Sequence, residues 1–369
     1  MEDKNDLLNN RDFLLKTKKR KYYHFFLREV NFFLQILKNK SRRKFTPLSV
    51  FFNLTDKCNL RCKYCYLSFD ERNCKELDLL QVKSVIDKLV KAGTRRISFT
   101  GGEPLLRDDI GEIIKYASDR NLILSLTTNG ILLEKKIRDL LLLDNISISF
   151  DGFDPESADP RGIDPQRVSR IIEIACQYFP SVQISATMHK NNLHEIDQLI
   201  SFSERVGCKI NFTPLMKKHY GNVKLPIENL LPDNDDCRYL FRKVAELKKK
   251  GKPVLLAYET YKYASEWPDF SKEFFTEGEE IPYKQIIKCS AGRKMFIIDT
   301  TGFAYPCFPL IGEMEGINIL NNDIATVMKH LSSHKCMTCP YPTHNEMNLI
   351  YSFHLKTMMS YFMSSIKRL

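Results

Sequence analysis

Six short apolar runs alternate with helical patterns between residues 46 and 215, and this alternation constrains the fold more than any other feature. The apolar runs read as strands over 48–54, 96–100, 122–127, 146–150, 182–188 and 209–214. Helical patterns follow them near 78–91, 108–119, 133–142, 165–176 and 193–206. Strands separated by helices of this length pair in parallel through right-handed crossovers. The sequence therefore predicts an α/β fold with a partial (βα)6 TIM-like barrel, whose chemistry gathers at the carboxyl ends of the strands.

Three cysteines, Cys58, Cys62 and Cys65, stand directly after the first strand, and an aromatic residue, Tyr64, precedes the last of them. This C-x3-C-x2-C spacing lets three sulfurs converge at the carboxyl end of a strand. Iron–sulfur clusters are usually held by four cysteinates, so a cubane on this loop keeps one iron open for a small molecule. The alternative is a zinc loop or a set of reduced structural thiols, although zinc sites normally come as two paired arms.

A second motif, Gly101-Gly102-Glu103-Pro104, ends the second strand 36 residues after the cysteine loop. Glycines allow the backbone to approach a ligand closely, and the Glu103 carboxylate can hydrogen-bond an ammonium group. Loop and motif together resemble the radical S-adenosylmethionine (SAM) superfamily. The resemblance implies a 4Fe-4S cluster on the three cysteines, SAM on the fourth iron, and the glycine motif at the SAM amino group. It also implies the activity, in which SAM is cleaved to methionine and a 5'-deoxyadenosyl radical that abstracts hydrogen from a substrate.

Polar residues near the tips of the third and fourth strands are candidates for the ribose of SAM. Hydroxyls and carboxylates at such tips can bind a diol, although Asn-Gly and Asp-Gly are also ordinary turn dipeptides. The candidates are Thr128, Asn129, Ser149 and Asp151. Two further cofactor-binding candidates, Arg161 and Asn191, resemble residues of the anaerobic sulfatase-maturase branch of the superfamily, where the arginine faces the active site.

Four more cysteines, Cys289, Cys307, Cys336 and Cys339, follow the barrel, and a hairpin over 295–305 separates the first two. The pattern resembles the twitch domain, a shortened SPASM domain found beside radical SAM barrels. This implies a second, auxiliary 4Fe-4S cluster on the four thiolates. A structural zinc on the same set is the alternative. A cluster with four thiolates has no open iron, so its expected role is electron transfer or structural support.

Positive charge is concentrated at the amino end of the chain. Residues 1–45 hold thirteen Lys or Arg against five Asp or Glu, which accounts for +8 of the net charge of +11. Two readings of this segment stay open: a basic amphipathic helix in the surface of an anionic membrane, or a helix packed against the outside or open end of the barrel. No nucleic-acid-binding motif accompanies the charges, so no such partner is expected. The apolar positions at helical spacing are Phe26, Val30, Phe33, Leu34 and Leu37.

Cysteine usage and hydropathy bear on the compartment. Eleven cysteines without a secretory leader indicate a reducing cytoplasm and metal ligation. No apolar run reaches the length of a membrane span. The expected location is the cytoplasm, or the inner face of the membrane if residues 1–45 bind it.

These features divide the chain into five predicted segments. They are the amino-terminal helix region (1–45), the barrel (46–225), a helical bridge (226–285), the auxiliary cluster domain (286–345) and a C-terminal amphipathic helix (346–369). The apolar stripe of the last segment runs from Tyr351 to Ile366.

Two hypotheses for the substrate and one non-enzymatic alternative stay open. In the first, the enzyme oxidises, epimerises or cross-links a peptide, protein or natural product, although residues 1–45 are too few for the winged-helix domain of many peptide-modifying relatives. In the second, it acts on a lipid or other apolar metabolite at the membrane surface, which would explain both amphipathic ends. In the third, the protein is a non-catalytic iron–sulfur or zinc protein for electron transfer or binding. The two enzymatic hypotheses require a one-electron reductant of the ferredoxin or flavodoxin type.

Overall fold

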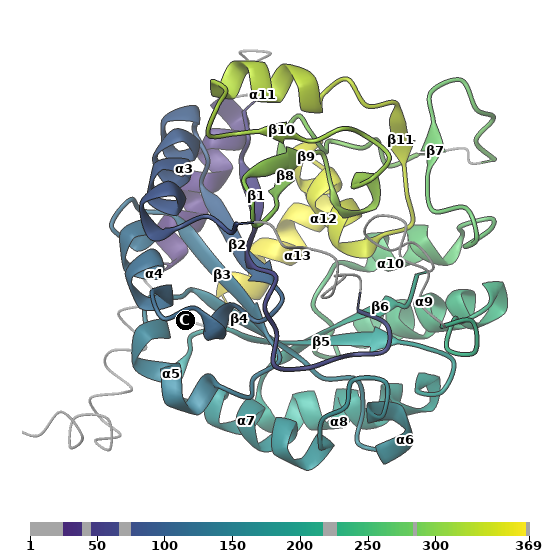
Figure 1. Ribbon diagram of the computed structural model, residues 1–369. Helices are drawn as coiled ribbons and strands as arrows, with labels where there is room; N and C mark the ends of the chain where they lie inside the picture. The colour runs from purple at the N-terminus through teal and green to yellow at the C-terminus, as the bar shows by residue number, and fades with distance from the viewer. Residues whose placement is uncertain (1–24, 39–45, 66–74, 217–226, 283–285, 367–369) are drawn as a thin grey trace, which may run out of the picture.

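A partial barrel of parallel strands forms the centre of the molecule (Figure 1). The computed structural model describes residues 25–38, 46–65, 75–216, 227–282 and 286–366. Six strands lie side by side in chain order and are parallel throughout. The predicted α/β fold is confirmed, and two of the strands have the predicted bounds. The strands are β1 (Ser49–Thr55), β2 (Arg96–Gly101), β3 (Ile123–Thr128), β4 (Asn145–Ser149), β5 (Val182–Met188) and β6 (Lys209–Pro214).

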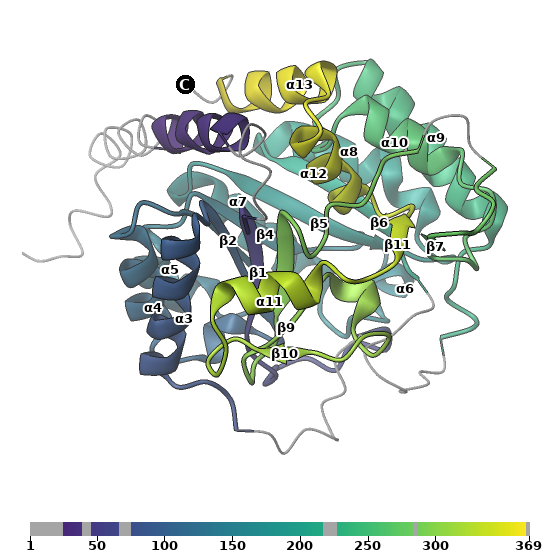
Figure 2. The ribbon, with the colours of Figure 1, turned by 90° about the horizontal axis from the view of Figure 1, so that it is seen from above.

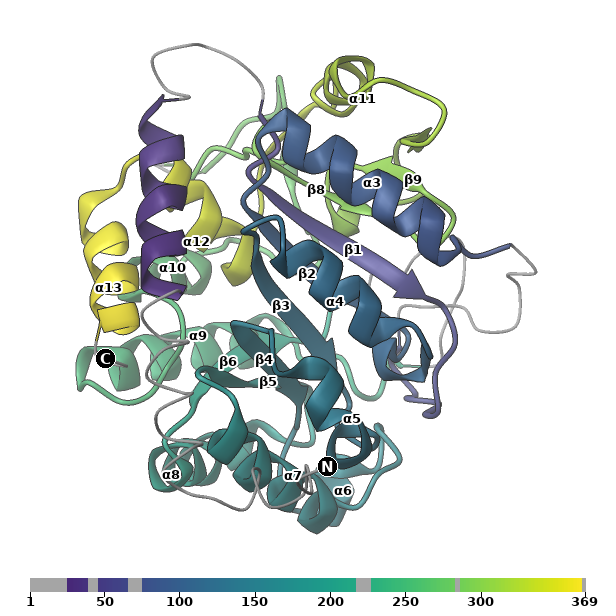
Figure 3. The same cartoon turned by 90° about the vertical axis from the view of Figure 1, so that its left-hand side faces the viewer.

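Helices between the strands cover the outer face of the sheet, and two of them, α3 and α4, lie across β1 to β3 in Figure 3. The start of α3 is set by Asp78, whose carboxylate accepts a hydrogen bond from the backbone of Gln81 while the Gln81 side chain bonds back. Gly93, with φ of 102°, ends the same helix. The outer helices are α3 (Leu79–Ala92), α4 (Ile110–Ser118), α5 (Leu133–Leu140), α6 (Pro155–Ala158), α7 (Pro165–Tyr178) and α8 (Ile196–Val206).

The predicted hairpin is present, and it belongs to the central sheet. β8 (Met295–Ile298) and β9 (Phe303–Tyr305) are antiparallel, and the Asp299 carboxylate accepts hydrogen bonds from two backbone N–H groups of the turn. β8 also pairs in parallel with β1, and β10 (Ile317–Asn318) adds to β9. The sheet therefore has nine strands in the order β10-β9-β8-β1-β2-β3-β4-β5-β6. Local sequence could not predict the β8–β1 pairing, because it joins opposite ends of the chain.

The opposite edge of the sheet, at β6, is covered as well. Ile210 in β6 donates to the carbonyl of Pro253 and accepts from the N–H of Leu255. Two helices that follow β6, α9 (Asn234–Lys249) and α10 (Tyr258–Ser265), pack into the same apolar core. Both edge strands of the partial barrel are therefore paired, β1 with β8 and β6 with the segment at Pro253–Leu255. Unpaired edge strands would invite association with other chains. The smaller elements of this half are β7 (Phe275–Thr276), α11 (Ile324–Leu331) and β11 (Cys336–Thr338).

Three helices lie at the amino ends of the strands: the helix over 25–38, α12 (Pro342–Tyr351) and α13 (Leu355–Ile366). Figure 2 shows the first of them beside α13. Arg28 donates to the carbonyl of Leu122, one residue before β3, and Glu29 pairs with Arg96, the first residue of β2. The helix over 25–38 is therefore packed against the open end of the barrel, which is the second of the two predicted readings. The rest of the basic segment, 1–24 and 39–45, lies outside the described residues.

Two details of these helices differ from the prediction. The buried line of the helix over 25–38 is Phe25, Glu29, Phe32 and Ile36, and the predicted apolar positions Leu34 and Leu37 are 49% and 52% exposed. Glu29 is buried because it pairs with the largely buried Arg96. The buried face of the helix therefore includes this acidic residue and leaves Leu34 and Leu37 exposed.

The predicted single C-terminal helix is two helices. α12 starts at Pro342 and ends at Tyr351, and Phe353, with φ of 65°, breaks the chain before α13. The apolar spacing continues through the break, so the sequence pattern concealed it. No helix in the described ranges is long and apolar enough to span a bilayer.

Candidate active site

A cavity of about 630 Å³ fills the inside of the partial barrel. At the carboxyl ends of the strands it is lined by the cysteine loop and by Gly101 and Gly102. At the amino ends it reaches Glu29 and Tyr361. The cavity therefore runs along the whole height of the barrel.

All three loop cysteines, Cys58, Cys62 and Cys65, line this cavity. The backbone N–H of Cys65 donates to the carbonyl of Cys62 at 3.0 Å, and the N–H of Leu60 points at the Cys58 sulfur at 3.4 Å. Burial raises the pKa of the Cys58 and Cys62 thiols. No fourth cysteine among the described residues lines the cavity. The loop thus offers three thiols to one space.

Gly101 and Gly102 are required by the backbone of the segment that leads into the cysteine loop. A Cβ on Gly101 would lie 2.4 Å from the carbonyl oxygen of Thr55, and one on Gly102 would lie 2.3 Å from that of Lys57. The N–H of Gly102 donates to Thr55 and that of Glu103 to Lys57, at 2.7 and 2.8 Å. In the structure the two glycines allow the motif to lie close to the backbone of residues 55–57. These contacts hold the start of the cysteine loop in place.

Glu103 lies behind the cavity wall, fully buried. Its carboxylate accepts hydrogen bonds from the hydroxyl of Thr128 and from the backbone N–H groups of Asn129 and Leu105, at 2.8, 2.8 and 3.0 Å. These bonds tie the end of β3 to the end of β2. Three donors of the chain thus bind this carboxylate, and its predicted contact with an ammonium group stays a prediction. Pro104 is buried in the short 3-10 turn that follows and also lies outside the cavity lining.

Asp151 joins three parts of the site. Its carboxylate accepts from the Tyr64 hydroxyl, from two nitrogens of Arg161 at 2.9 and 3.0 Å, and from the backbone N–H of Thr187 at 2.8 Å. The predicted ribose contact of Asp151 is not what this arrangement provides, because its side chain is 1% exposed and its oxygens face protein donors. Tyr64 and Arg161 do line the cavity. Burial raises the pKa of the Tyr64 hydroxyl well above its ordinary value.

The loop after β5 contains Asn191, a predicted cofactor-binding residue, and its neighbour Asn192. Asn191 is exposed and does not line the cavity. Its neighbour Asn192 is fully buried, and its amide donates to the carbonyls of Asp151 and Thr187 at 3.0 and 2.9 Å. Asn192 thus holds the two strand ends together, and the sequence Asn191-Asn192 alone does not indicate which residue turns inward.

Three other candidates, Thr128, Asn129 and Ser149, line the cavity, and their contact with a ribose stays a prediction. The Asn129 amide donates to the Asn59 side chain at 2.8 Å and also points at the Cys58 sulfur at 3.9 Å. Asn129 therefore connects the tip of β3 with the cysteine loop.

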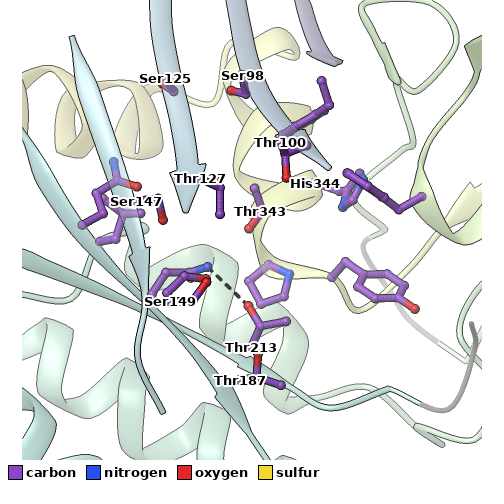
Figure 4. Close-up of a pocket in the computed structure, with 18 of the residues that line it drawn as sticks. Ser98, Thr100, Ser125, Thr127, Ser147, Ser149, Thr187, Thr213, Thr343 and His344 are labelled. Atoms are coloured by element: carbon purple, nitrogen blue, oxygen red, sulfur yellow. Dashed lines mark hydrogen bonds between the residues drawn. The ribbon is translucent and has the colours of Figure 1, made fainter. Parts of the chain in front are cut away.

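Hydroxyl side chains along the strands line the inner wall (Figure 4), and of those in the repeats given below only Ser149 was among the predicted site residues. Alternate residues of a strand face the same side, so a repeated Ser-x-Ser or Ser-x-Thr pattern was the available signal. The amide of Asn211 and the hydroxyl of Thr213 in β6 continue this wall and bond each other at 3.3 Å. The repeats are Ser98-Phe99-Thr100, Ser125-Leu126-Thr127, Ser147-Ile148-Ser149 and Ser185-Ala186-Thr187.

The four C-terminal cysteines meet between the hairpin and β11. The N–H of Cys289 donates to the carbonyl of Met337 at 2.8 Å. A hydrogen bond with Cys289 and burial raise the pKa of Cys336, and the nearby thiols of Cys339 and Cys307 add to this. The fold therefore brings together all four cysteines that the sequence grouped.

The chemistry of both donor sets suits iron–sulfur clusters, which cysteinates hold. One set faces a cavity with three thiols, and the other is a buried set of four. Among the described residues no three His, Cys, Asp or Glu side chains converge closely enough for one metal ion. A cubane holds its cysteinates farther apart than a single ion does.

Comparison with known proteins relates this arrangement to an enzyme family. The model of the Radical SAM superfamily matches residues 52–203. Mycofactocin maturase MftC of Mycobacterium tuberculosis is 26% identical over 267 residues, which cover 71% of this chain and 64% of that protein. A probable GTP 3',8-cyclase of Methanococcus maripaludis is 31% identical over 212 residues, covering 54% of this chain and 70% of that protein. The chain thus spans less than two thirds of the length of the maturase.

A solved structure shares the fold. The crystal structure of Streptococcus suis SuiB bound to its precursor peptide SuiA matches with a TM-score of 0.61 and 18% sequence identity. The match covers 80% of this chain and 67% of SuiB. At this identity the likeness concerns the fold alone.

Proposed function

The chain belongs to the radical SAM superfamily, and on this premise we propose that it is a peptide-modifying enzyme with a 4Fe-4S cluster on Cys58, Cys62 and Cys65. One observation carries the proposal: the three cysteines of a single loop line the same cavity as Gly101 and Gly102. When bound, such a cluster supplies the electron that cleaves the carbon–sulfur bond of SAM and yields the 5'-deoxyadenosyl radical.

The residues of this chain hold the loop and shape the space above it. Asn129 ties the loop to β3, and hydrogen bonds to cysteine sulfurs tune the potential of a cluster. Tyr64 and Arg161, both fixed by Asp151, hold the far side of the loop. We assign positioning roles to Asp151 and Glu103, because their carboxylates face donors of the chain.

For direct contact with SAM we propose residues that line the cavity at the strand tips. The backbone of Gly101 and Gly102 is suited to the amino group, and the hydroxyls of Thr128 and Ser149 are suited to the ribose. Arg161 lines the same region but is bound twice to Asp151. Its charge is therefore satisfied before any ligand arrives.

For Cys289, Cys307, Cys336 and Cys339 we propose an auxiliary 4Fe-4S cluster in a twitch-type module. The support is that the four thiols lie close enough to shift the pKa of Cys336. Four thiolates leave no iron for a substrate, so electron transfer or structural support is the role we assign. Analysis of iron, sulfide and zinc in anaerobically purified protein separates this proposal from a zinc site.

A peptide is the substrate class that we propose. Support comes from mycofactocin maturase among the relatives and from SuiB with its precursor peptide among the structures. The relative at 31% identity is a probable GTP cyclase, so the substrate class needs a test of its own.

An apolar substrate at a membrane surface is the second candidate, and exposed apolar side chains favour it. Leu34, Leu37, Leu355 and Met359 are 49%, 52%, 72% and 65% exposed on the helix over 25–38 and on α13. Flotation with phosphatidylglycerol vesicles tests this candidate. A Leu34→Ser/Leu37→Ser variant should then remain in the soluble fraction while the unaltered chain floats, and equal behaviour of the two would exclude contact through this face.

SAM cleavage is the decisive test of the proposed function. Anaerobically reconstituted protein is mixed with SAM and dithionite, or with a reduced ferredoxin or flavodoxin, and 5'-deoxyadenosine is measured by chromatography. We expect 5'-deoxyadenosine above the level of a protein-free control. Its absence from protein that carries both clusters would favour a non-catalytic electron-transfer protein, and zinc in place of iron would favour a zinc-binding protein.

A further inference from the structure

Six hydroxyl side chains inside the barrel have no hydrogen-bond partner among the described residues. All of them line the cavity, and Figure 4 labels those that belong to β2, β3 and β4. These residues are half-buried and face the cavity, so their hydroxyls are placed to bind water or a ligand. They are Ser98, Thr100, Ser125, Thr127, Ser147 and Ser185.

Depth separates part of this set from the proposed SAM contacts. Ser98, Ser125 and Ser147 stand two residues before Thr100, Thr127 and Ser149, which places them about 6–7 Å deeper in the barrel. Ser98 lies opposite Ser125, and Thr127 lies opposite Ser147, in the register of the sheet. Neighbouring strands are about 4.8 Å apart. The hydroxyls therefore form a regular array beneath the SAM region.

The array itself carries no ionisable side chain, and few charged residues line the cavity in the described part of the chain. Charged residues that line the cavity are paired at its two ends, Glu29 with Arg96 and Arg161 with Asp151. Glu346 lines the cavity too, and its carboxylate accepts hydrogen bonds from Ala257 and Thr260. The hydroxyl array is a stripe of neutral donors and acceptors in a wall that also contains many apolar side chains, such as Phe51, Leu255 and Met347. Such a stripe suits amide and hydroxyl groups. It disfavours phosphates and carboxylates, which lack a counter-charge here, and hydrocarbons, which would leave the hydroxyls unbonded.

One aromatic ring completes the wall from the side of the auxiliary cysteines. His344, in the first turn of α12, lines the cavity and packs against Phe51 and Tyr341, with ring centroids 6.4 and 5.8 Å away. Neither of its ring nitrogens bonds to another described residue. Burial lowers the pKa of His344 to about 4, so its neutral ring offers one donor and one acceptor.

We propose that the middle of the barrel binds an uncharged polar stretch of the peptide substrate, and that His344 is a specificity residue that hydrogen-bonds this stretch. The inference rests on the proposed function, because it needs a peptide substrate. An extended peptide presents amide groups at regular intervals, and the array of hydroxyls is regular in the same way. Serine, threonine, asparagine and glutamine side chains add further groups that the wall can bind.

Two pools of fluorescein-labelled octapeptides test the proposal by fluorescence anisotropy on the reconstituted protein with SAM. One pool varies among Ser, Thr, Asn and Gln, and the other among Leu, Ile, Val and Phe. We expect the polar pool to bind at least about tenfold more tightly, because several hydroxyls would otherwise stay unbonded. Phosphatidylglycerol vesicles form a third arm for the apolar alternative.

Variants connect the preference to named side chains. His344→Phe should weaken binding of the polar pool about five- to tenfold, and His344→Gln, which keeps a donor and an acceptor, should recover most of the loss. The double variant Ser125→Ala/Ser147→Ala should weaken binding to a similar degree. Ser201→Ala is the matched control, because that hydroxyl lies on α8 and bonds the backbone of Asp197.

The outcomes are distinct for the inference and for the function. Equal affinity for the two pools, or a preference for the apolar pool or the vesicles, overturns the inference. Variants that bind the polar pool as tightly as the unaltered protein overturn it too, because the hydroxyls then hold only water. Formation of 5'-deoxyadenosine without peptide is measured in parallel. If it forms while the pools do not differ, this inference alone fails, and if none forms, the proposed function fails.

Discussion

The two cysteine sets of this chain are built in opposite ways. The open set, Cys58, Cys62 and Cys65, comes from eight consecutive residues and faces a large cavity. The closed set consists of the auxiliary cysteines, which are spread over residues 289–339 and become neighbours only when β11 meets the segment at Cys289. The first set can form on a local loop, whereas the second needs the complete tertiary structure. We infer that a reactive site can be formed by one local loop because it must stay accessible. A closed site built from distant segments can instead stabilise the tertiary structure.

The largest expected effect separates the sets by activity. A Cys58→Ala/Cys62→Ala/Cys65→Ala variant should form 5'-deoxyadenosine only at the background rate and should keep about half of the iron, because the auxiliary set remains. Chromatography and iron analysis measure both quantities. Cys176→Ala, which changes a cysteine outside both sets, is the control. Cleavage of SAM at the unaltered rate would contradict the assignment of the open set.

The second prediction concerns the closed set. A Cys336→Ala/Cys339→Ala variant should also lose about half of the iron, because one of two clusters is gone, and it should retain SAM cleavage. Its thermal unfolding temperature should fall further than that of the triple variant, because these cysteines connect distant segments. Calorimetry of the two variants side by side gives the order. A larger fall in the unfolding temperature of the triple variant would mean that the closed set does not stabilise the tertiary structure more than the open set does.

Behind the open set, Asp151 provides a sharper test. Asp151→Asn leaves the buried Arg161 without its charge partner, which costs about 3–5 kcal/mol when one member of a buried ion pair is removed. Urea unfolding of the metal-free protein measures the change. Asp159→Asn is the matched control, because Asp159 pairs with Lys63 of the same loop at the surface, where such pairs contribute about 1 kcal/mol or less. Similar losses in the two variants would show that the buried pair does not stabilise the loop.

The smallest effect concerns Glu346 on α12, the helix that follows the closed set. Burial raises the pKa of Glu346 to about 7, above the value of about 4.3 for an unfolded chain. The folded protein therefore holds a proton that the unfolded chain releases between these values, so stability falls as the pH rises from about 4 to 7. Glu346→Gln should equal the unaltered protein at pH 4 and exceed its stability by about 1–3 kcal/mol at pH 8. Parallel stability profiles of the two proteins across this range would contradict the prediction.

The strands and the donor cysteines could be predicted because their signals are local. Apolar spacing gave the bounds of β5 and β6, and cysteine spacing identified both thiol sets. Side-chain direction at the strand tips was harder. Glu103 and Asp151 were predicted as ligand contacts, and in the structure both carboxylates accept hydrogen bonds from neighbouring N–H and hydroxyl groups.

Other features depend on partners that are distant in sequence. The face of the helix over 25–38 that becomes buried is decided by Arg96, which no local spacing could indicate. Asn192 and Asn191 are chemically identical, and only the strand ends above them select one. The hydroxyls of the inner wall were visible as a repeat, but their meaning appears only once the strands are aligned.

The pairing of β8 with β1 has a consequence for how the protein can be divided. A fragment that stopped after β6 would contain every residue of the open thiol set, yet its first strand would present an unprotected row of amide and carbonyl groups. Such a fragment would tend to polymerise by adding strands from other copies. The barrel therefore cannot be trimmed to an independent catalytic piece, and exchange of C-terminal modules between related enzymes would have to carry the sealing strand along.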